Sequence, residues 1–240
     1  MGKKAVTGVV LQARLDSSRL PGKALLPLDG EPLLLRVMEA LKTVPADRHI
    51  LACPEDSRGA FAPLSDRAGF ALLCGSKEDV LSRYCAAIRA FGLERVIRAT
   101  GDNPFVFSDA ADALNREAGG ADYAAYAGLP HGAGVEAVRA DALLRAEAEA
   151  PSGAAREHVC PYLYGNPDRF LLHRPLAPRP WRGPRLRITV DTRADYERAA
   201  MLYEEITEIT EITETTEPGA RYRGEAIIAA YYRRFGPEGR

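Results

Sequence analysis

Short apolar runs alternate with helix-like segments along the N-terminal half of the chain, and this alternation limits the possible folds more than any other feature. Short apolar-rich runs, typical of buried strands, lie at residues 6–11, 49–52, 71–74 and 95–99. Segments with helical periodicity lie between them at residues 33–41, 58–68 and 77–91. Strands that alternate with helices pair in parallel through right-handed crossovers. We therefore predict an α/β fold in which helices flank a mostly parallel central sheet.

The second half of the chain is less regular. After a predicted helix at residues 108–118, the pattern predicts short strands at residues 122–127, 135–138 and 170–173, with a helix at residues 140–150. These elements would form a smaller subdomain beside the main sheet. A returning core strand at residues 186–190 and a helix from residue 194 to about residue 205 would complete the core.

Residues 206–217 repeat the triplet Ile-Thr-Glu. A period of three matches neither the 3.6 residues of a helical turn nor the two-residue period of a strand, so no single face stays apolar. We predict a surface connection with no functional role of its own. A last helix is expected at residues 225–235, after a Pro-Gly pair.

The loop after the first predicted strand is rich in groups that bind phosphate. Residues 11–25 contain Arg14, Arg19 and Lys23 together with Ser17 and a Pro-Gly turn. Ligands of α/β proteins bind beyond the carboxyl ends of the strands, where this loop lies. Arginine forks, a lysine ammonium and inward-pointing backbone N–H groups all suit a triphosphate. The alternative is a solvated basic turn, because neither common nucleotide-binding glycine motif is present here.

Two aspartates follow predicted strands and would face the same crevice. Asp102 comes after the strand at residues 95–99, and Asp191 comes after the strand at residues 186–190. Mg²⁺ prefers oxygen ligands and usually takes one or two carboxylates, with phosphate and water as the rest. The pair therefore predicts a magnesium site opposite the basic loop, and the alternative is that both residues only cap strand ends.

Residues 12–23 resemble the N-terminal motif of the cytidylyltransferases that activate acidic sugars, such as acylneuraminate and 3-deoxy-manno-octulosonate. The resemblance is strongest to their spore-coat polysaccharide biosynthesis F-type branch. Further segments that resemble this branch follow in order at residues 75–84, at 100–104, at 156–159 with 161–162, and at 187–192 with 195–197. The resemblance implies a Rossmann-like nucleotide-diphospho-sugar transferase fold in a single domain. Its parts would be a nucleotide-binding half (about 1–118), an acceptor-side half with the returning strand (about 119–200), the repeat, and a C-terminal helix (218–240).

The resemblance also implies an activity and a set of site residues. The reaction would be Mg²⁺-dependent transfer of CMP from CTP to an acidic or phosphorylated sugar, with release of pyrophosphate, in surface polysaccharide synthesis. Catalytic roles would fall to Arg14, Lys23 and Asp102, and the metal would bind Asp102 and Asp191. The expected nucleotide- and sugar-binding residues are Leu11, Ala13, Arg14, Ser17, Arg19, Lys23, Gly75, Ser76, Thr100, Glu136, Arg156 and His158.

Three positions depart from the family pattern. Asp16 replaces a glycine that is usual in the loop, and its charge would oppose a bound triphosphate. His131 and Gly134 stand where acidic residues are often found, which bears on acceptor binding. These departures leave open a non-catalytic nucleotide- or sugar-binding protein on the same scaffold. A glycosyltransferase that uses a finished nucleotide sugar is a third possibility, although the chain shows no D-x-D triplet to support it.

Composition limits the classes of binding partner and the cellular compartment that we expect for this protein. A formal net charge of −1 gives no reason to expect nucleic acid or an anionic membrane as a partner. The four cysteines are widely spaced without a C-x-x-C pair, as expected of reduced thiols in the cytoplasm. No apolar stretch approaches the ~20 residues of a membrane-spanning helix. A homodimer is expected from the family resemblance alone.

Overall fold

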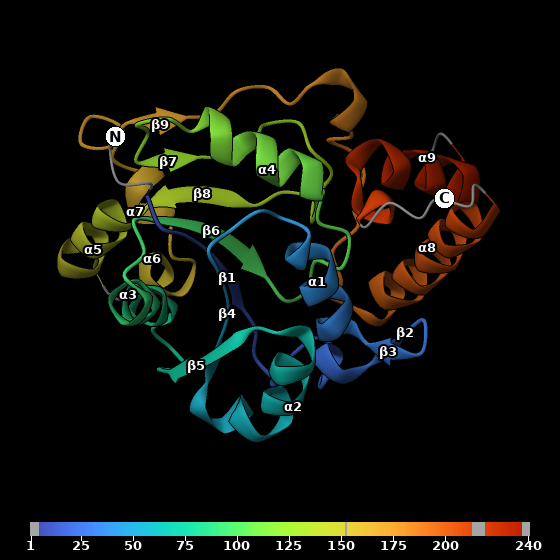
Figure 1. Ribbon diagram of the computed structural model, residues 1–240, viewed down its shortest axis with the longest axis horizontal. Coiled ribbons are helices and arrows are strands. Elements are labelled where there is room, and N and C mark those ends of the chain that lie inside the picture. The colour runs from blue at the N-terminus through green and yellow to red at the C-terminus, as the bar shows by residue number, and fades with distance from the viewer. Residues whose placement is uncertain (1–4, 152, 213–218, 237–240) are drawn as a thin grey trace.

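The computed structural model describes residues 5–151, 153–212 and 219–236, and it confirms the predicted α/β architecture (Figure 1). A 7-stranded sheet has the order β5-β4-β1-β6-β8-β7-β9. The parallel part consists of β5 (Ala71–Gly75), β4 (Arg48–Pro54), β1 (Thr7–Gln12) and β6 (Arg95–Thr100). On the other side, β8 (Glu136–Arg139) runs antiparallel to β6 and to β7 (Tyr123–Ala124), and β9 (Leu172–His173) is parallel to β7.

Helices cover both faces of the sheet (Figure 1). The first along the chain are α1 (Leu33–Lys42), α2 (Arg58–Ala68), α3 (Val80–Phe91), α4 (Ser108–Glu117) and α5 (Ala140–Glu149). In β1, Val9 and Leu11 pack into a hydrophobic cluster with side chains of α1 and α4, whereas Val10 packs into a second cluster with side chains of α3 and α5. Because both faces are buried, the centre of β1 is a continuous apolar run at residues 9–11 rather than an alternating pattern.

Shorter elements join these layers. The hairpin of β2 (Pro27–Leu28) and β3 (Glu31–Pro32) and the short helices α6 (Ala154–Glu157) and α7 (Pro161–Tyr164) were not expected from the pattern. The 3₁₀ turns are η1 (Lys23–Leu25), η2 (Glu55–Ser57), η3 (Arg179–Trp181) and η4 (Ala220–Tyr222). The C-terminal helices are α8 (Arg193–Ile212) and α9 (Gly224–Phe235). Within the described ranges, no helix is long and apolar enough to span a bilayer.

The prediction of a core strand at residues 186–190 is wrong. The segment is extended and buried at Leu186, Ile188 and Val190, but its only strand-like pairing in the described structure is a single bridge between Arg187 and His131. The reason lies in its backbone hydrogen bonds, which go to two different loops instead of one strand. The Ile188 N–H donates to the His131 carbonyl (2.9 Å), and the Val190 N–H donates to the Asp102 carbonyl (2.8 Å).

The repeat also differs from its prediction, because α8 continues through residue 212 and makes residues 206–212 helical. Ile206 is buried beside Leu202 and Tyr203, and Ile209 packs against the same cluster. Residues three or four apart lie on one side of a helix, so two triplets still keep their isoleucines near one face. Residues 213–217 of the repeat lie outside the described residues.

Truncation of Ile206 tests this helical packing. Ile206→Ala should lower the free energy of unfolding by about 2–5 kcal/mol, because a buried aliphatic side chain is lost and a cavity is left. Urea denaturation gives the value directly. Glu208→Ala, on the exposed side of the same triplet, is the control and should cost less than about 0.5 kcal/mol. Equal, small costs for both variants would mean that the repeat is a loose connection.

Candidate functional site

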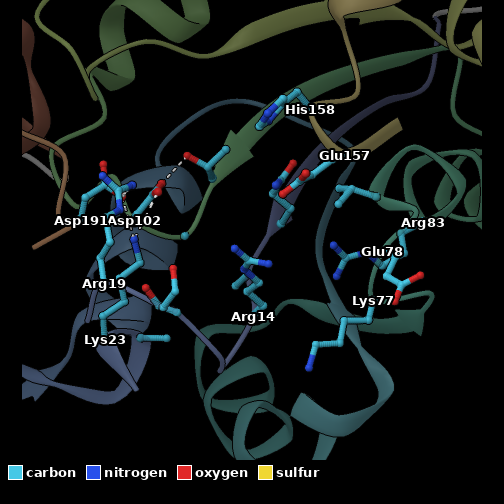
Figure 2. A pocket seen from close by; sticks show the side chains of 18 of the residues that line it. Arg14, Arg19, Lys23, Lys77, Glu78, Arg83, Asp102, Glu157, His158 and Asp191 are labelled. Atoms are coloured by element: carbon cyan, nitrogen blue, oxygen red, sulfur yellow. Dashed lines mark hydrogen bonds and ion pairs between the residues drawn. The ribbon is translucent and has the colours of Figure 1, made fainter. Parts of the chain in front are cut away.

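A pocket of about 670 Å³ opens at the carboxyl ends of the parallel strands (Figure 2). Its wall includes the ends of β1 and β6, the loop after β1 and the start of α3. Of the residues predicted from sequence, those that line it are Ala13, Arg14, Ser17, Arg19, Lys23, Thr100, Asp102, His158 and Asp191. The structure thus brings the basic loop and both strand-end aspartates to one cavity, of a size that suits a small-molecule ligand.

The basic loop is held at both ends while its charged side chains stay accessible. At its start, the Ala13 N–H donates to the Ala52 carbonyl (3.2 Å). At its end, Gly22 adopts a left-handed conformation (φ 68°), which glycine tolerates without strain, and this turn begins η1 at Lys23. Arg14 and Arg19 are exposed in between. The loop can therefore present fixed positive charge to an anion.

Lys23 links the two aspartates. Its Nζ lies 3.4 Å from Asp102 Oδ2 and 3.2 Å from Asp191 Oδ1, and it donates to the Val190 carbonyl at 2.7 Å. The other oxygen of Asp102, Oδ1, accepts a hydrogen bond from the Thr100 hydroxyl (2.6 Å). A cation thus already sits where the two carboxylates converge.

Asp191 is surrounded by positive charge. Arg19 approaches its Oδ1 at 2.9 Å, and Arg187 approaches its Oδ2 at 2.7 Å while also pairing with Asp195 at 3.2 Å. Burial raises the pKa of Asp191, but the opposite effect of Lys23, Arg19 and Arg187 together is larger, so the pKa lies below its usual value. Asp191 is therefore a carboxylate at neutral pH.

The donor set fits a divalent cation. Carboxylate oxygens of Asp102 and Asp191 meet around the Lys23 ammonium, which stands in for a bound ion. Among the described residues, no three His, Cys, Asp or Glu side chains group in a way that could hold a metal. A cation here would therefore need phosphate oxygens and water as further ligands, which is the usual arrangement for Mg²⁺.

Three residues expected near the base do not line the pocket: Leu11, Gly75 and Ser76. The side chain of Leu11 is fully buried in the core. The N-cap of α3 is Asp79, whose carboxylate accepts from the Ser82 N–H (2.9 Å). The Ser76 hydroxyl accepts from the Asp79 N–H (3.1 Å), so it shapes the turn before the helix.

Sequence reasoning missed Arg83, a buried arginine in the pocket wall. Its side chain is directed toward the cavity from α3 (Figure 2), and the residue is only 2% exposed. Its Nε and Nη1 have no hydrogen-bond partner among the described residues. Burial lowers the pKa of Arg83, and the nearby charge of Arg14 adds to this effect. The available signal was an arginine on the apolar face of a predicted helix, between Val80 and Ala87.

On the predicted acceptor side, His158 and its neighbour Glu157 line the pocket, but Glu136 and Arg156 do not. The Glu136 carboxylate pairs with Arg98 and accepts from the Tyr123 hydroxyl (2.7 Å). Arg98 itself reaches the pocket.

Arg156 holds two elements together instead of facing the cavity. Its guanidinium pairs with Asp79 at 2.7 Å and donates to the Glu147 carbonyl at 2.8 Å. It therefore ties the start of α3 to α5.

The charge of Asp16 has a partner in the structure. Lys77 Nζ lies 2.6 Å from Asp16 and 3.0 Å from Asp56. These carboxylates raise the pKa of Lys77, with Asp16 making the larger contribution. Lys77 therefore offsets the negative charge that Asp16 adds to the loop in place of the usual glycine.

The model of a protein family described as cytidylyltransferase matches residues 9–219. The chain belongs to this family. The chain is 32% identical over 208 residues to the spore coat polysaccharide biosynthesis protein SpsF of Bacillus subtilis, and the alignment covers 83% of this chain and 87% of that protein. This confirms the expected nucleotidyltransferase family and its spore-coat branch as a relative.

Solved structures show the same fold at lower sequence identity. A cytidylyltransferase from Leptospira borgpetersenii aligns with a TM-score of 0.77 at 23% identity, over 88% of this chain and 95% of that one. A CMP:2-keto-3-deoxy-manno-octonic acid synthetase complexed with CTP aligns with a TM-score of 0.65 at 17% identity, over 84% and 99%. Rv0371c of Mycobacterium tuberculosis, in complex with manganese, aligns with a TM-score of 0.59 at 16% identity, over 82% and 98%.

Acid should weaken the fold through this charged cluster. Asp191 and Asp195 both have a pKa below the usual value, since contacts with cations and N–H groups outweigh the opposing effect of burial. Their stabilisation is complete above the unfolded-state pKa of about 3.9 and is lost as pH falls through the lower folded-state pKa. The free energy of unfolding should therefore drop as the pH is lowered below about 4.

Urea unfolding at pH 7 and pH 3 provides the measurement. Asp195→Asn should be less stable than the wild type at pH 7, and the difference should shrink at pH 3. The control is Asp66→Asn, at an exposed position whose side chain forms no hydrogen bond or ion pair with the residues that the structure describes. A difference for Asp195→Asn that stays constant with pH would contradict the assignment.

Proposed function

We propose that this cytidylyltransferase transfers CMP from CTP to an acidic or phosphorylated sugar, with Mg²⁺ as the cation and pyrophosphate as the second product. The observation that carries this proposal is the single pocket that joins a basic loop to two strand-end carboxylates. The CTP complex of the structurally similar synthetase supports the nucleotide. The similarity to SpsF supports a role in surface polysaccharide synthesis.

The residues divide the work by position. Arg14, Arg19 and Lys23 would bind the β- and γ-phosphates and stabilise the negative charge of the leaving pyrophosphate. Asp102 and Asp191 would hold the cation, which would supply positive charge to neutralise the phosphates. An oxygen of the sugar would then attack the α-phosphorus in line. The bond from the α-phosphorus to the oxygen shared with the β-phosphate breaks, pyrophosphate leaves, and the proton of a hydroxyl nucleophile passes to solvent. Catalysis comes from this alignment and from fixed charge, with no covalent intermediate on the protein.

Arg83 is suited to select the base. A guanidinium offers parallel N–H donors, and cytosine offers two adjacent acceptors, O2 and N3. Uracil carries a hydrogen on N3 and would leave one donor unpaired, which is costly in a buried site. Arg83 lines the pocket, and its Nη1, one member of the parallel Nη1/Nη2 pair, has no hydrogen-bond partner among the described residues, which supports this role.

The binding-protein alternative rested on Asp16, His131 and Gly134. Asp16 is paired with Lys77, and neither His131 nor Gly134 belongs to the described lining of the pocket. This favours an enzyme. We place it in the cytoplasm, in agreement with four free cysteines, and we expect a homodimer, which light scattering can test.

The activity is tested by pyrophosphate release from CTP with Mg²⁺ and a panel of acidic and phosphorylated sugars. Asp102→Asn should lower turnover by about 10²- to 10³-fold, by analogy with the loss of other preorganised charges. Asp66→Asn is the control and should keep full turnover. Saturable CTP binding without pyrophosphate release for any sugar would instead indicate a binding protein.

Arg83→Met tests base selection, because methionine keeps an unbranched apolar stem without the guanidinium. Loss of a bidentate pair should weaken CTP binding by roughly 5- to 150-fold and leave UTP binding less affected. Isothermal titration with both nucleotides measures the ratio. Arg89→Met, on the exposed side of α3, is the matched control. If CTP and UTP lose affinity equally, Arg83 does not select the base.

A further inference from the structure

The cluster around Asp191 is balanced in charge without any metal. Its cations are Lys23, Arg19 and Arg187, and its carboxylates belong to Asp102, Asp191 and Asp195. Each of the three carboxylates contacts at least one of these cations. A divalent cation that arrived here alone would meet a neutral, internally paired site and three positive side chains.

Lys23 occupies the position where the two proposed metal ligands converge. Its Nζ contacts one oxygen of each, at 3.4 Å for Asp102 and 3.2 Å for Asp191, and it also bonds to the Val190 carbonyl at 2.7 Å. Its side chain is only 14% exposed, and that of Asp191 is 13% exposed. A cation that needs the same two carboxylate oxygens must therefore displace the ammonium.

The backbone of Lys23 is fixed by hydrogen bonds, whereas its side chain can rotate. The Lys23 N–H donates to the Leu20 carbonyl (3.2 Å), and the Lys23 carbonyl accepts from the Leu26 N–H (3.2 Å). The side chain beyond this anchor is a flexible four-carbon stem. It lines the same pocket as Arg14 and Arg19, so a polyphosphate bound by those arginines lies within the cavity that Nζ faces.

We propose that Lys23 is an internal counter-ion that holds Asp102 and Asp191 together in the free protein and excludes a divalent cation until a polyphosphate draws its ammonium away. The cation therefore binds with the nucleotide and not before it. The identity of the triggering ligand and the role of Asp102 and Asp191 as metal ligands rest on the proposed function. By linkage, metal and polyphosphate each strengthen the binding of the other.

The test is a Mn²⁺ titration of the nucleotide-free protein, followed by electron paramagnetic resonance of the unbound ion. Lys23→Met, which removes the charge but keeps an unbranched side chain, should bind Mn²⁺ at least ~10-fold more tightly than the wild type, because the two carboxylates lose their internal cation. Adding Asp102→Asn to Lys23→Met should abolish this gain. A gain of affinity that depends on Asp102 is not expected from a merely structural lysine.

Arg14→Met is the matched control, since it removes one positive charge from the same pocket, while the cations that pair with the two aspartates within the described structure are Lys23, Arg19 and Arg187. It should leave Mn²⁺ affinity close to that of the wild type. The proposal is overturned if folded Lys23→Met gains no affinity, or if Arg14→Met gains as much. The assay contains no nucleotide or sugar, so its failure is separate from a failure to find turnover.

Discussion

The site depends on one backbone contact between distant parts of the chain. The Val190 N–H donates to the Asp102 carbonyl at 2.8 Å, and Ile188 and Val190 are buried beneath it. This contact fixes a late segment against the turn that ends β6. Two carboxylates that are far apart in the sequence then lie within reach of a single lysine. The charge cluster, the pocket and the proposed metal chemistry all follow from this crossing.

Sequence alone predicted the parallel half of the fold well, because β1, β4, β5 and β6 are short apolar-rich runs between amphipathic helices. It failed where pairing is not repetitive. Residues 186–190 have the apolar pattern of a strand, but their hydrogen bonds go to separate loops, which no local pattern records. The helix at residues 206–212 was missed because a triplet period was judged without the helix that precedes it.

The same contrast holds for the site. The basic loop could be recognised because its cationic residues lie within one short segment, and the aspartates could be recognised because each follows an apolar-rich run. Glu136 and Arg156 could not be placed, since both are taken up by ion pairs with residues distant in sequence, Arg98 and Asp79. Arg83 was overlooked because an arginine on a helix is normally assumed to reach solvent. Its isolation from partners is visible only in three dimensions.

The carboxylate of Asp79 contacts two elements at once, and this couples their movements. Its carboxylate caps α3 through the Ser82 N–H and also pairs with Arg156, which belongs to α6 beside Glu157 and His158. The wall that carries Arg83 and the wall that carries His158 are therefore joined by the ion pair between Asp79 and Arg156. A ligand that shifts either wall must shift the other, so the two ends of the pocket should tighten or loosen as one body.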